Sequence, residues 1–342
     1  MKIGITLHPY GEKKPAGLGR AVFEIARSML EIDKKNEYTI FLKNPKLNPD
    51  LPGNNWKTSP LTLATTRLLD VCIFNTPVMP WWYGILGKSK KSIVIAYDFA
   101  YLQYSPSRFL KFIHGLALKK ADLIISISEV TKKDLIEIFK IPEEKIKVVY
   151  LGYNKIGEIS PESILDLPEK FFFFVGAIKE RKNVFGVVSA FGEYKKSGGD
   201  HKLVIAGNGS GEYYEKILRF IKENNLSDSV IFLGQITDNN LSYLYKRAEA
   251  LVYPSFIEGF GLPVLEAQDC GLPVITSNIS SLPEVAGDGA ILVDPNNIFE
   301  IAEAMKRISQ NQDFRQNLIE KGILNSKKFS WQNTAQEILR LL

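Results

Sequence analysis

The chain has 342 residues, of which 45% are hydrophobic and 24% are charged, and its formal net charge is +5. This length exceeds what one ordinary hydrophobic core accommodates, so we expect two domains. Cys72 and Cys270 have no metal-type spacing and the three histidines do not cluster, which favours free thiols, a reducing cytoplasmic compartment and no metal site. The chain opens directly into a strand without a signal peptide, and no apolar run approaches the ~18 residues of a membrane span.

The positive charge is concentrated in the first half of the chain. Residues 1–155 carry 24 Lys and Arg against 14 Asp and Glu, whereas residues 156–342 carry 19 against 24. A basic half suits an anionic membrane surface or an anionic acceptor, although ordinary solvated lysines give the same count. The segment Pro80–Tyr83 (PWWY) with Lys88, Lys90 and Lys91 behind it fits a lipid headgroup interface. The alternative is that Trp81 and Trp82 pack beneath a loop.

Short apolar strands alternate with helices along the chain, a pattern typical of a parallel sheet covered on both faces. In the first half we expect strands at Ile3–Leu7, Tyr38–Leu42, Val71–Phe74, Ile93–Tyr97, Leu123–Ile127 and Ile146–Tyr150, with helices at Gly19–Ile32 and Pro106–Lys120. In the second half we expect strands at Phe171–Gly176, Leu203–Ala206, Val230–Leu233, Ala250–Tyr253, Val274–Thr276 and Ala290–Val293. Its expected helices are Val184–Lys196, Glu212–Glu223, Asn240–Ala248, Gly261–Asp269 and Ile298–Ser309.

The polar segment Asn154–Lys170, with Gly157, Pro161 and Pro168, separates the two halves and is interpreted as a linker. We therefore predict two α/β domains, residues 1–155 and 156–330, each a doubly wound Rossmann-like sheet. Open sheets of this kind bind ligands beyond the carboxyl ends of their strands.

Two carboxylates flank a glycine-rich turn in LVYPSFIEGFGLPVLEA. Glu258 falls in the loop after an apolar strand, and Glu266 falls about one turn inside the helix that follows. Pro263 suits the first turn of that helix, where its missing N–H costs nothing. The amides of Phe260, Gly261 and Leu262 lie at the helix N-terminus, which attracts phosphate through free donors and the helix dipole. A strand–turn–helix with two surface glutamates remains the alternative reading.

A second candidate is GAIKERKN, which follows a strand and precedes a helix with Asn183 as its expected N-cap. Arg181 and Lys182 would then stand beside helix amides, a combination that suits a leaving diphosphate. A charged surface loop is the alternative.

The residues EGFGLPVLEA, followed by GLPVITSN and SLPEVAGDGA, resemble the donor-binding signature of glycosyltransferase family 4, the retaining nucleotide-sugar transferases. The resemblance extends over most of the chain and is densest after residue 170. It implies the two-domain GT-B architecture with the site between two facing sheets, and a C-terminal helix, residues 331–342, that packs back on the first domain.

The resemblance also assigns roles to single residues. Glu258 would hold the sugar hydroxyls, Arg181 and Lys182 the diphosphate, and Glu266 the ribose. Gly17 and Gly19 in AGLGR would approach the diphosphate from the first domain, while Gly207 and Asn208 would lie near the nucleotide and Ile236 near the base. Tyr97 stands where the family usually has a histidine close to the sugar, and beside it Asp98 either faces the site or caps the next loop. Ser128 is expected to cap a helix.

We therefore predict a retaining hexosyltransferase, either free in the cytoplasm or peripheral on the inner face of a membrane, that moves a hexose from a nucleotide diphosphate sugar to a glycan or lipid-linked hydroxyl. GDP-mannose is the first candidate donor, because GAIKERKN leans towards mannosyltransferase relatives. We expect no metal, no further cofactor and no nucleic-acid partner. A sugar-nucleotide epimerase of the same shape and an inactive nucleotide-sugar-binding scaffold are the alternatives.

Overall fold

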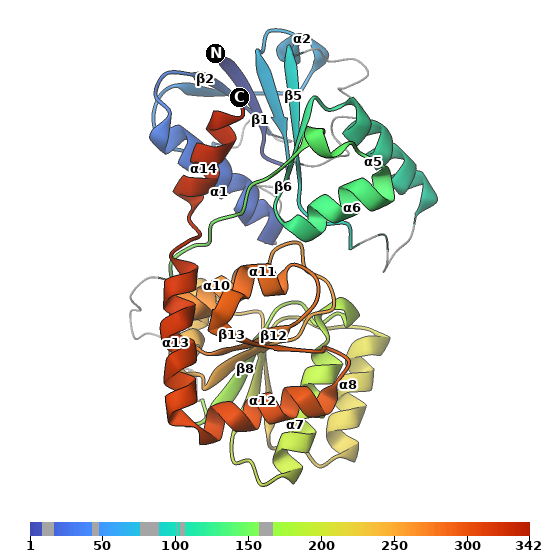
Figure 1. The fold of residues 1–342 in the computed structure, drawn as a ribbon, viewed down its shortest axis with the longest axis vertical. Helices are drawn as coiled ribbons and strands as arrows, with labels where there is room; N and C mark the ends of the chain where they lie inside the picture. The colour runs from blue at the N-terminus through green and yellow to red at the C-terminus, as the bar shows by residue number, and fades with distance from the viewer. Residues whose placement is uncertain (9–16, 43–47, 76–88, 101, 103–106, 157–166) are drawn as a thin grey trace. The chain divides into compact units, whose positions relative to one another are not determined.

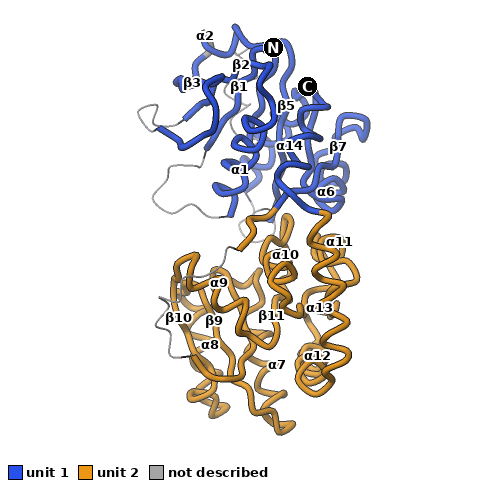
Figure 2. Tube along the Cα trace, turned by 90° about the vertical axis from the view of Figure 1, so that its left-hand side faces the viewer, with its two compact units in different colours: residues 1–152, 329–342 blue, residues 153–328 orange. Residues whose placement is uncertain are grey.

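The structure, a computed structural model, describes residues 1–342 except 9–16, 43–47, 76–88, 101, 103–106 and 157–166. The chain divides into two compact units, which Figure 2 colours separately. Unit 1 comprises residues 1–152 and 329–342, and unit 2 comprises residues 153–328. The division lies close to residue 155, where the sequence places the domain boundary, and part of the expected linker lies outside the described residues.

Unit 1 is built on a parallel sheet. Its described part has seven strands in the order β3-β2-β1-β4-β5-β6-β7. The strands are β1 (Lys2–Thr6), β2 (Glu37–Phe41), β3 (Trp56–Ser59), β4 (Val71–Phe74), β5 (Lys91–Ala96), β6 (Leu123–Ser126) and β7 (Ile146–Val148). The sequence pattern does not predict β3, because this edge strand is polar and only partly buried, so it lacks the apolar run of a central strand.

Helices cover both faces of this sheet (Figure 1). They are α1 (Gly17–Ile32), α2 (Leu63–Thr66), α5 (Arg108–Lys120), α6 (Glu129–Phe139) and α14 (Trp331–Arg340), with a short 3₁₀ turn η1 (Glu143–Lys145). The α6 helix is capped by Ser128, whose side chain accepts a hydrogen bond from the Thr131 amide, as the sequence predicts.

The C-terminal helix α14 packs against α1 in unit 1. A Cβ at Gly152 would lie 2.1 Å from the Trp331 nitrogen, so only glycine allows the chain to pass here. The Thr334 hydroxyl donates to the Tyr150 carbonyl at 2.8 Å, and Lys91 Nζ donates to the Leu341 carbonyl at 2.6 Å. These contacts hold the end of the chain on the first unit.

Unit 2 repeats the architecture. Among its described residues, six parallel strands run in the order β10-β9-β8-β11-β12-β13. The strands are β8 (Phe171–Val175), β9 (Lys202–Ala206), β10 (Val230–Gly234), β11 (Ala250–Tyr253), β12 (Val274–Ser277) and β13 (Ala290–Val293). Phe171 to Phe174 are four consecutive buried aromatic residues in the middle of this sheet, as expected for a strand covered on both faces.

The helices of unit 2 surround its sheet (Figure 1). They are α7 (Val184–Lys196), α8 (Glu212–Glu223), α9 (Asp238–Arg247), α10 (Leu262–Asp269), α11 (Leu282–Ala286), α12 (Ile298–Gln310) and α13 (Gln312–Ser326), with 3₁₀ turns η2 (Glu180–Lys182) and η3 (Gly287–Gly289). Neither α11 nor α13 is predicted by the sequence pattern. The former has only five residues, and the latter lacks the apolar stripe by which an amphipathic helix is recognised.

Both sheets reverse their direction of strand addition beside their first strand, between β1 and β4 in unit 1 and between β8 and β11 in unit 2. At such a switch point the loops leaving two neighbouring strands diverge, and doubly wound folds bind their ligands there. The two doubly wound α/β sheets predicted from the sequence are thus confirmed, and Arg181, Lys182 and Glu258 follow the two strands beside the switch point of unit 2.

Candidate functional site

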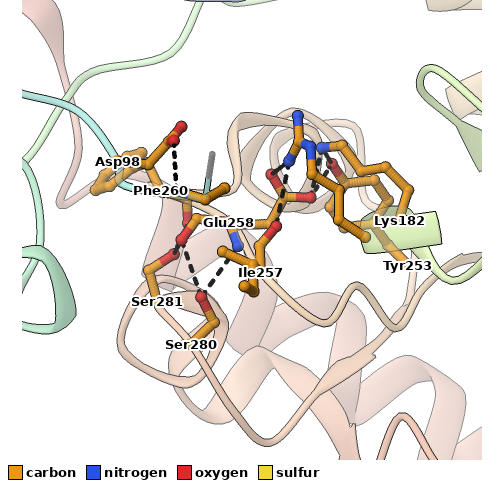
Figure 3. A network of polar contacts seen from close by, with 10 residues as sticks. Asp98, Lys182, Tyr253, Ile257, Glu258, Phe260, Ser280 and Ser281 are labelled. Atoms are coloured by element: carbon orange, nitrogen blue, oxygen red, sulfur yellow. Dashed lines mark hydrogen bonds and ion pairs between the residues drawn. The ribbon is translucent and has the colours of Figure 1, made fainter. Parts of the chain in front are cut away.

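Two loops at the switch point of unit 2 bring four side chains together. Arg181 and Lys182 come from the loop after β8, Tyr253 ends β11, and Glu258 comes from the loop after β11. Lys182 Nζ lies 2.5 Å from Glu258 Oε1 and 2.5 Å from the Tyr253 hydroxyl oxygen. The Tyr253 hydroxyl donates to the same Glu258 oxygen at 2.8 Å. Figure 3 shows these three side chains meeting, and we call Arg181, Lys182, Tyr253 and Glu258 the charged cluster.

Asn183 fixes the loop that carries the two cations. It adopts the left-handed conformation at φ 55° and caps α7 by accepting a hydrogen bond from the Gly186 amide. Its side-chain amide donates to the carbonyls of Pro254 and Pro295, which joins the loop after β8 to the loops after β11 and β13. The expected N-cap is therefore confirmed, and the same side chain also aligns the two halves of the charged cluster.

The loop that carries Glu258 is held by two serines (Figure 3). The Glu258 amide donates to Ser280 Oγ at 3.0 Å, and Ser280 Oγ donates back to the Glu258 carbonyl at 2.9 Å. Ser281 Oγ donates to the carbonyls of Glu258 and Phe260. Arg181 Nη1 donates to the Ile257 carbonyl at 3.2 Å. The backbone around Glu258 is thus fixed, and so is the direction of its side chain.

The electrostatics of the cluster favour the ionised form of Glu258. Burial alone raises the pKa of its carboxyl, but the charges of Lys182 and Arg181, with hydrogen bonds from Lys182 and Tyr253, bring the pKa below the ordinary value of 4.5. Lys182 and Glu258 are each only 9% exposed, whereas the Arg181 side chain is 30% exposed. Lys182 therefore faces a buried counter-ion. The Arg181 guanidinium lies 3.6 Å from Glu258 Oε2 and also reaches solvent, where it is accessible to an anion.

Tyr253 belongs to the charged cluster, but it is not among the site residues predicted from the sequence. It is 1% exposed, and burial followed by the nearby Glu258 carboxylate raises the pKa of its hydroxyl well above 10. It is therefore a neutral donor that links an ammonium and a carboxylate. The available signal was its place at the end of a strand, directly before Pro254, where a buried aromatic has a polar tip to satisfy.

The turn between the two glutamates has the geometry that the sequence predicts. Gly261 is the N-cap of α10 at φ 112°, and Leu262 and Pro263 are the first two helical residues. A Cβ on Gly261 would lie 2.8 Å from Leu282 Cδ2, so the close approach and the positive φ both require glycine here. Phe260 is buried at 4% exposure directly before this turn. Glu266 lies in the second turn of α10, where the Tyr245 hydroxyl of α9 donates to its Oε2 at 2.9 Å.

Loops after β9 and β10 complete this edge of the sheet. A Cβ on Gly207 would lie 1.9 Å from the Gly176 carbonyl oxygen, and the Gly207 amide donates to the Gly234 carbonyl at 2.7 Å. Asn208 is exposed and donates to Gln235 Oε1 at 3.4 Å, while Ile236 packs partly buried against the core. The structure therefore places most candidate residues of unit 2 in loops that share one edge, with Glu266 in helix α10, and the charged cluster brings Arg181, Lys182 and Glu258 together.

Two family models match this chain in succession. Residues 17–155 match "Glycosyltransferase Family 4", and residues 155–324 match "Glycosyl transferases group 1". The chain belongs to glycosyltransferase family 4. The sequence resemblance is thereby confirmed, and the two models meet close to the division between the two units.

Relatives in this family include O-antigen mannosyltransferases. O-antigen chain mannosyltransferase B of Escherichia coli is 30% identical over 231 residues, which cover 65% of this chain and 61% of that protein. The serotype-specific mannosyltransferase WbdA of Escherichia coli is 32% identical over 231 residues, covering 64% of this chain and 28% of that protein. The chain thus spans less than two thirds of the length of either relative.

Solved structures with the same fold cover nearly the whole chain. A sucrose-phosphate synthase from Thermosynechococcus elongatus superposes with a TM-score of 0.82 at 19% identity, over 99% of this chain and 98% of that one. HepE of Anabaena, in complex with UDP and glucose, gives a TM-score of 0.80 at 17% identity, over 100% and 99%. The GT-B fold class predicted from the sequence is confirmed.

The candidate residues of the N-terminal half lie in unit 1. Gly17 and Gly19 fall in the first turn of α1, and a Cβ on Gly17 would meet nothing within 4 Å, so packing does not require glycine there. Tyr97 directly follows β5 and donates from its hydroxyl to Asn75 Oδ1 at 2.8 Å. Asp98 accepts from the Ala100 amide at 3.1 Å, the capping alternative of the sequence analysis. The segment with Trp81 and Trp82 lies outside the described residues.

Two other features are absent from the part of the chain that the structure describes. The described residues contain no group of three or more His, Cys, Asp and Glu side chains placed to hold a metal ion. No helix among them combines the length and the apolar character needed to cross a bilayer.

The lowered pKa of Glu258 predicts a pH-dependent contribution to stability. A carboxyl whose folded pKa lies below its unfolded value of 4.5 stabilises the fold above that pH and loses the effect as the pH falls through the folded pKa. Glu258→Gln should therefore lower the free energy of unfolding by roughly 3 kcal/mol at neutral pH, because Lys182 keeps a buried charge without its counter-ion. Below pH 4.5 the difference from wild type should shrink. Denaturant unfolding across this pH range measures it.

Tyr253→Phe is the matched control. It removes a hydroxyl but keeps both charges, so it should cost about 1 kcal/mol and leave most of this pH dependence intact. A Glu258→Gln difference that stays constant with pH would contradict the assignment.

Proposed function

We propose that this chain is a retaining glycosyltransferase that moves a hexose from a nucleotide diphosphate sugar to a hydroxyl acceptor. The observation that carries the proposal is the charged cluster, which sets two cations and one ionised carboxylate at the switch point of unit 2. The family membership and the O-antigen mannosyltransferase relatives support it, with GDP-mannose as the first candidate donor. HepE, which has the same fold, binds UDP and glucose, so a UDP-sugar is the competing donor.

In this proposal the charged cluster acts on the leaving group. The bond from the anomeric carbon to the diphosphate oxygen breaks, the acceptor oxygen bonds to that carbon on the same face, and the acceptor proton passes to the departing diphosphate. Negative charge grows on the diphosphate as this happens. Arg181, Lys182 and the amides around Phe260–Leu262 are set to stabilise it, and a preorganised donor of this kind is worth ~3–4 kcal/mol.

We propose that the two glutamates bind different parts of the donor, outside its diphosphate. Glu258 would accept hydrogen bonds from the sugar hydroxyls while keeping Lys182 in place. Glu266, already fixed by Tyr245, would accept hydrogen bonds from the ribose, with Gly207, Asn208 and Ile236 beside the nucleotide. Gly17 and Gly19 are proposed to meet the diphosphate from unit 1.

The acceptor is proposed to be a glycan or a lipid-linked glycan of a cell-surface polysaccharide, on the cytoplasmic face of a membrane. Two relatives are named O-antigen chain mannosyltransferases. A relative from Campylobacter jejuni, 30% identical over 237 residues, is named for a diphospho-undecaprenol-linked acceptor. These names concern those proteins, and they supply the acceptor class that is proposed here.

Donor binding and turnover test the proposal directly. A thermal-shift screen of GDP-sugars and UDP-sugars should identify the donor, since a ligand at ~100 times its dissociation constant stabilises by ~2.7 kcal/mol. Lys182→Ala should then lower turnover of that donor by roughly 10²–10³-fold, measured under conditions in which the variant is folded, because removing this lysine also leaves Glu258 buried without its counter-ion. Lys179→Ala is the matched control, because Lys179 is an exposed lysine of the same loop and should leave turnover near wild type. Donor isomerisation without transfer, or binding without turnover, would instead establish the epimerase or the scaffold.

Substitutions of the two glutamates should change different quantities, the maximal rate for Glu258 and the nucleotide affinity for Glu266. Glu258→Gln should lower the maximal rate, because its side chain is assigned to the reacting sugar, whereas Glu266→Gln should weaken nucleotide binding, because ribose is remote from the bond that breaks. Steady-state rates with calorimetric titration of the free nucleotide measure both. Equal rates and unchanged nucleotide affinity in the two variants would remove these roles.

Transfer is expected to need no divalent cation. The charge of the leaving diphosphate is assigned to Arg181 and Lys182, which do the work that a bound metal does in other transferases. Activity measured in EDTA should therefore equal activity without it. Loss of activity in EDTA that magnesium or manganese restores would show that these two cations are insufficient.

A further inference from the structure

Helix α5 of unit 1 presents large apolar side chains to solvent. Phe109 is 68% exposed and Phe112 is 64% exposed, while Leu110 and Leu116 are 39% and 36% exposed. Of the twelve exposed large hydrophobic residues in the described part of the chain, four thus lie on one helix of thirteen residues. Scattered single exposures are ordinary on a protein surface, but a contiguous apolar patch marks a site of interaction.

The spacing of these residues makes a stripe. Phe109, Phe112 and Leu116 are three and four positions apart, so they stand on one side of the helix within about 60° of one another. The buried residues Ile113, His114, Ala117 and Leu118 lie on a different side of the helix, which runs from beside Phe109 round to the face opposite it. Because these already hold the helix on unit 1, the exposed stripe is not needed for folding.

Cations border the stripe. Arg108, Lys111, Lys119 and Lys120 are exposed, and the helix RFLKFIHGLALKK contains no acidic residue. Lys119 and Lys120 occupy its last turn, where they also complement the helix dipole. By contrast, the exposed Phe299 of α12 stands next to Glu300 and Leu324 of α13 stands one turn from Glu320.

We propose that α5 is an interfacial helix that docks unit 1 on an anionic lipid bilayer. Two phenyl rings and a leucine would enter the boundary between headgroups and acyl chains, and the lysine and arginine side chains would extend to lipid phosphates. The charge composition selects this occupant. A helix with four exposed cations and no acidic residue complements an anionic headgroup layer, whereas the core of a protein interface is depleted in charged residues.

None of the residues named for this surface comes from the aromatic segment around Trp81, which lies outside the described residues. The docking surface extends the proposed function, because a transferase with a lipid-linked acceptor must reach the membrane that holds this lipid. Its role in catalysis therefore rests on the proposed acceptor. Vesicle binding needs neither donor nor turnover, so a failure of the docking surface and a failure of the proposed transfer are told apart.

Co-sedimentation tests the proposal. The full chain should bind vesicles of equimolar phosphatidylglycerol and phosphatidylcholine at low salt, bind vesicles of phosphatidylcholine alone weakly, and be released as salt rises. The double variant Phe109→Ser, Phe112→Ser should weaken binding at least about tenfold, because two exposed rings lose their apolar partner. The triple variant Lys111→Gln, Lys119→Gln, Lys120→Gln should weaken it by about fivefold for each cation.

Matched variants on unit 2 control for exposure and charge. Phe299→Ser removes a ring that is 69% exposed, and a triple variant removes the exposed lysines Lys222, Lys321 and Lys327. Both should bind vesicles as wild type does, and thermal unfolding should match wild type in every variant, because the changed side chains are exposed. The proposal is overturned if wild type does not sediment with anionic vesicles. It is equally overturned if both α5 variants bind as wild type, an outcome that would assign this face to a protein partner.

Discussion

The ion pair between Lys182 and Glu258 is the contact on which the rest of the candidate site depends. Two largely buried charges are costly to remove from water, and their attraction offsets that cost only when geometry and further hydrogen bonds are favourable. Here the Tyr253 hydroxyl bridges both groups, and Arg181 adds a second positive charge. The pair also joins the loops after two neighbouring strands, through two residues that are 76 positions apart in the chain.

Holding such a pair demands unusual backbone in the surrounding loops. Asn183 takes a left-handed conformation and uses its side chain to join three loops. Gly207 and Gly261 stand where a Cβ would collide with backbone or a neighbouring side chain. The left-handed conformation of Asn183 costs conformational energy and persists because the surrounding contacts determine it, whereas the missing Cβ of Gly207 and Gly261 avoids such a cost. The loops therefore present a prearranged set of charges and amides rather than one assembled on binding.

The two units carry different kinds of surface, and each kind suits a different partner in the proposed reaction. Unit 2 holds buried charges suited to a diphosphate, whereas unit 1 carries the excess of lysine and arginine and the exposed apolar stripe of α5. A nucleotide sugar calls for fixed, desolvated contacts, because its recognition uses directional hydrogen bonds. A bilayer surface calls for exposed rings and mobile cations, because it has no fixed structure to match.

The sequence by itself determined the alternation of strands and helices, the two doubly wound units, and the strand–turn–helix that carries Glu258, Gly261 and Glu266. Local rules suffice for these, since apolar runs, caps and positive-φ glycines act within a few residues. It did not predict the edge strand β3 or the helix α13, whose patterns are weak. Only the tertiary structure decided that Lys182 and Tyr253 share the Glu258 carboxylate, and that Phe109 and Phe112 stay exposed. Contacts between distant loops, and the choice of which apolar side chains a unit leaves uncovered, depend on how whole elements pack.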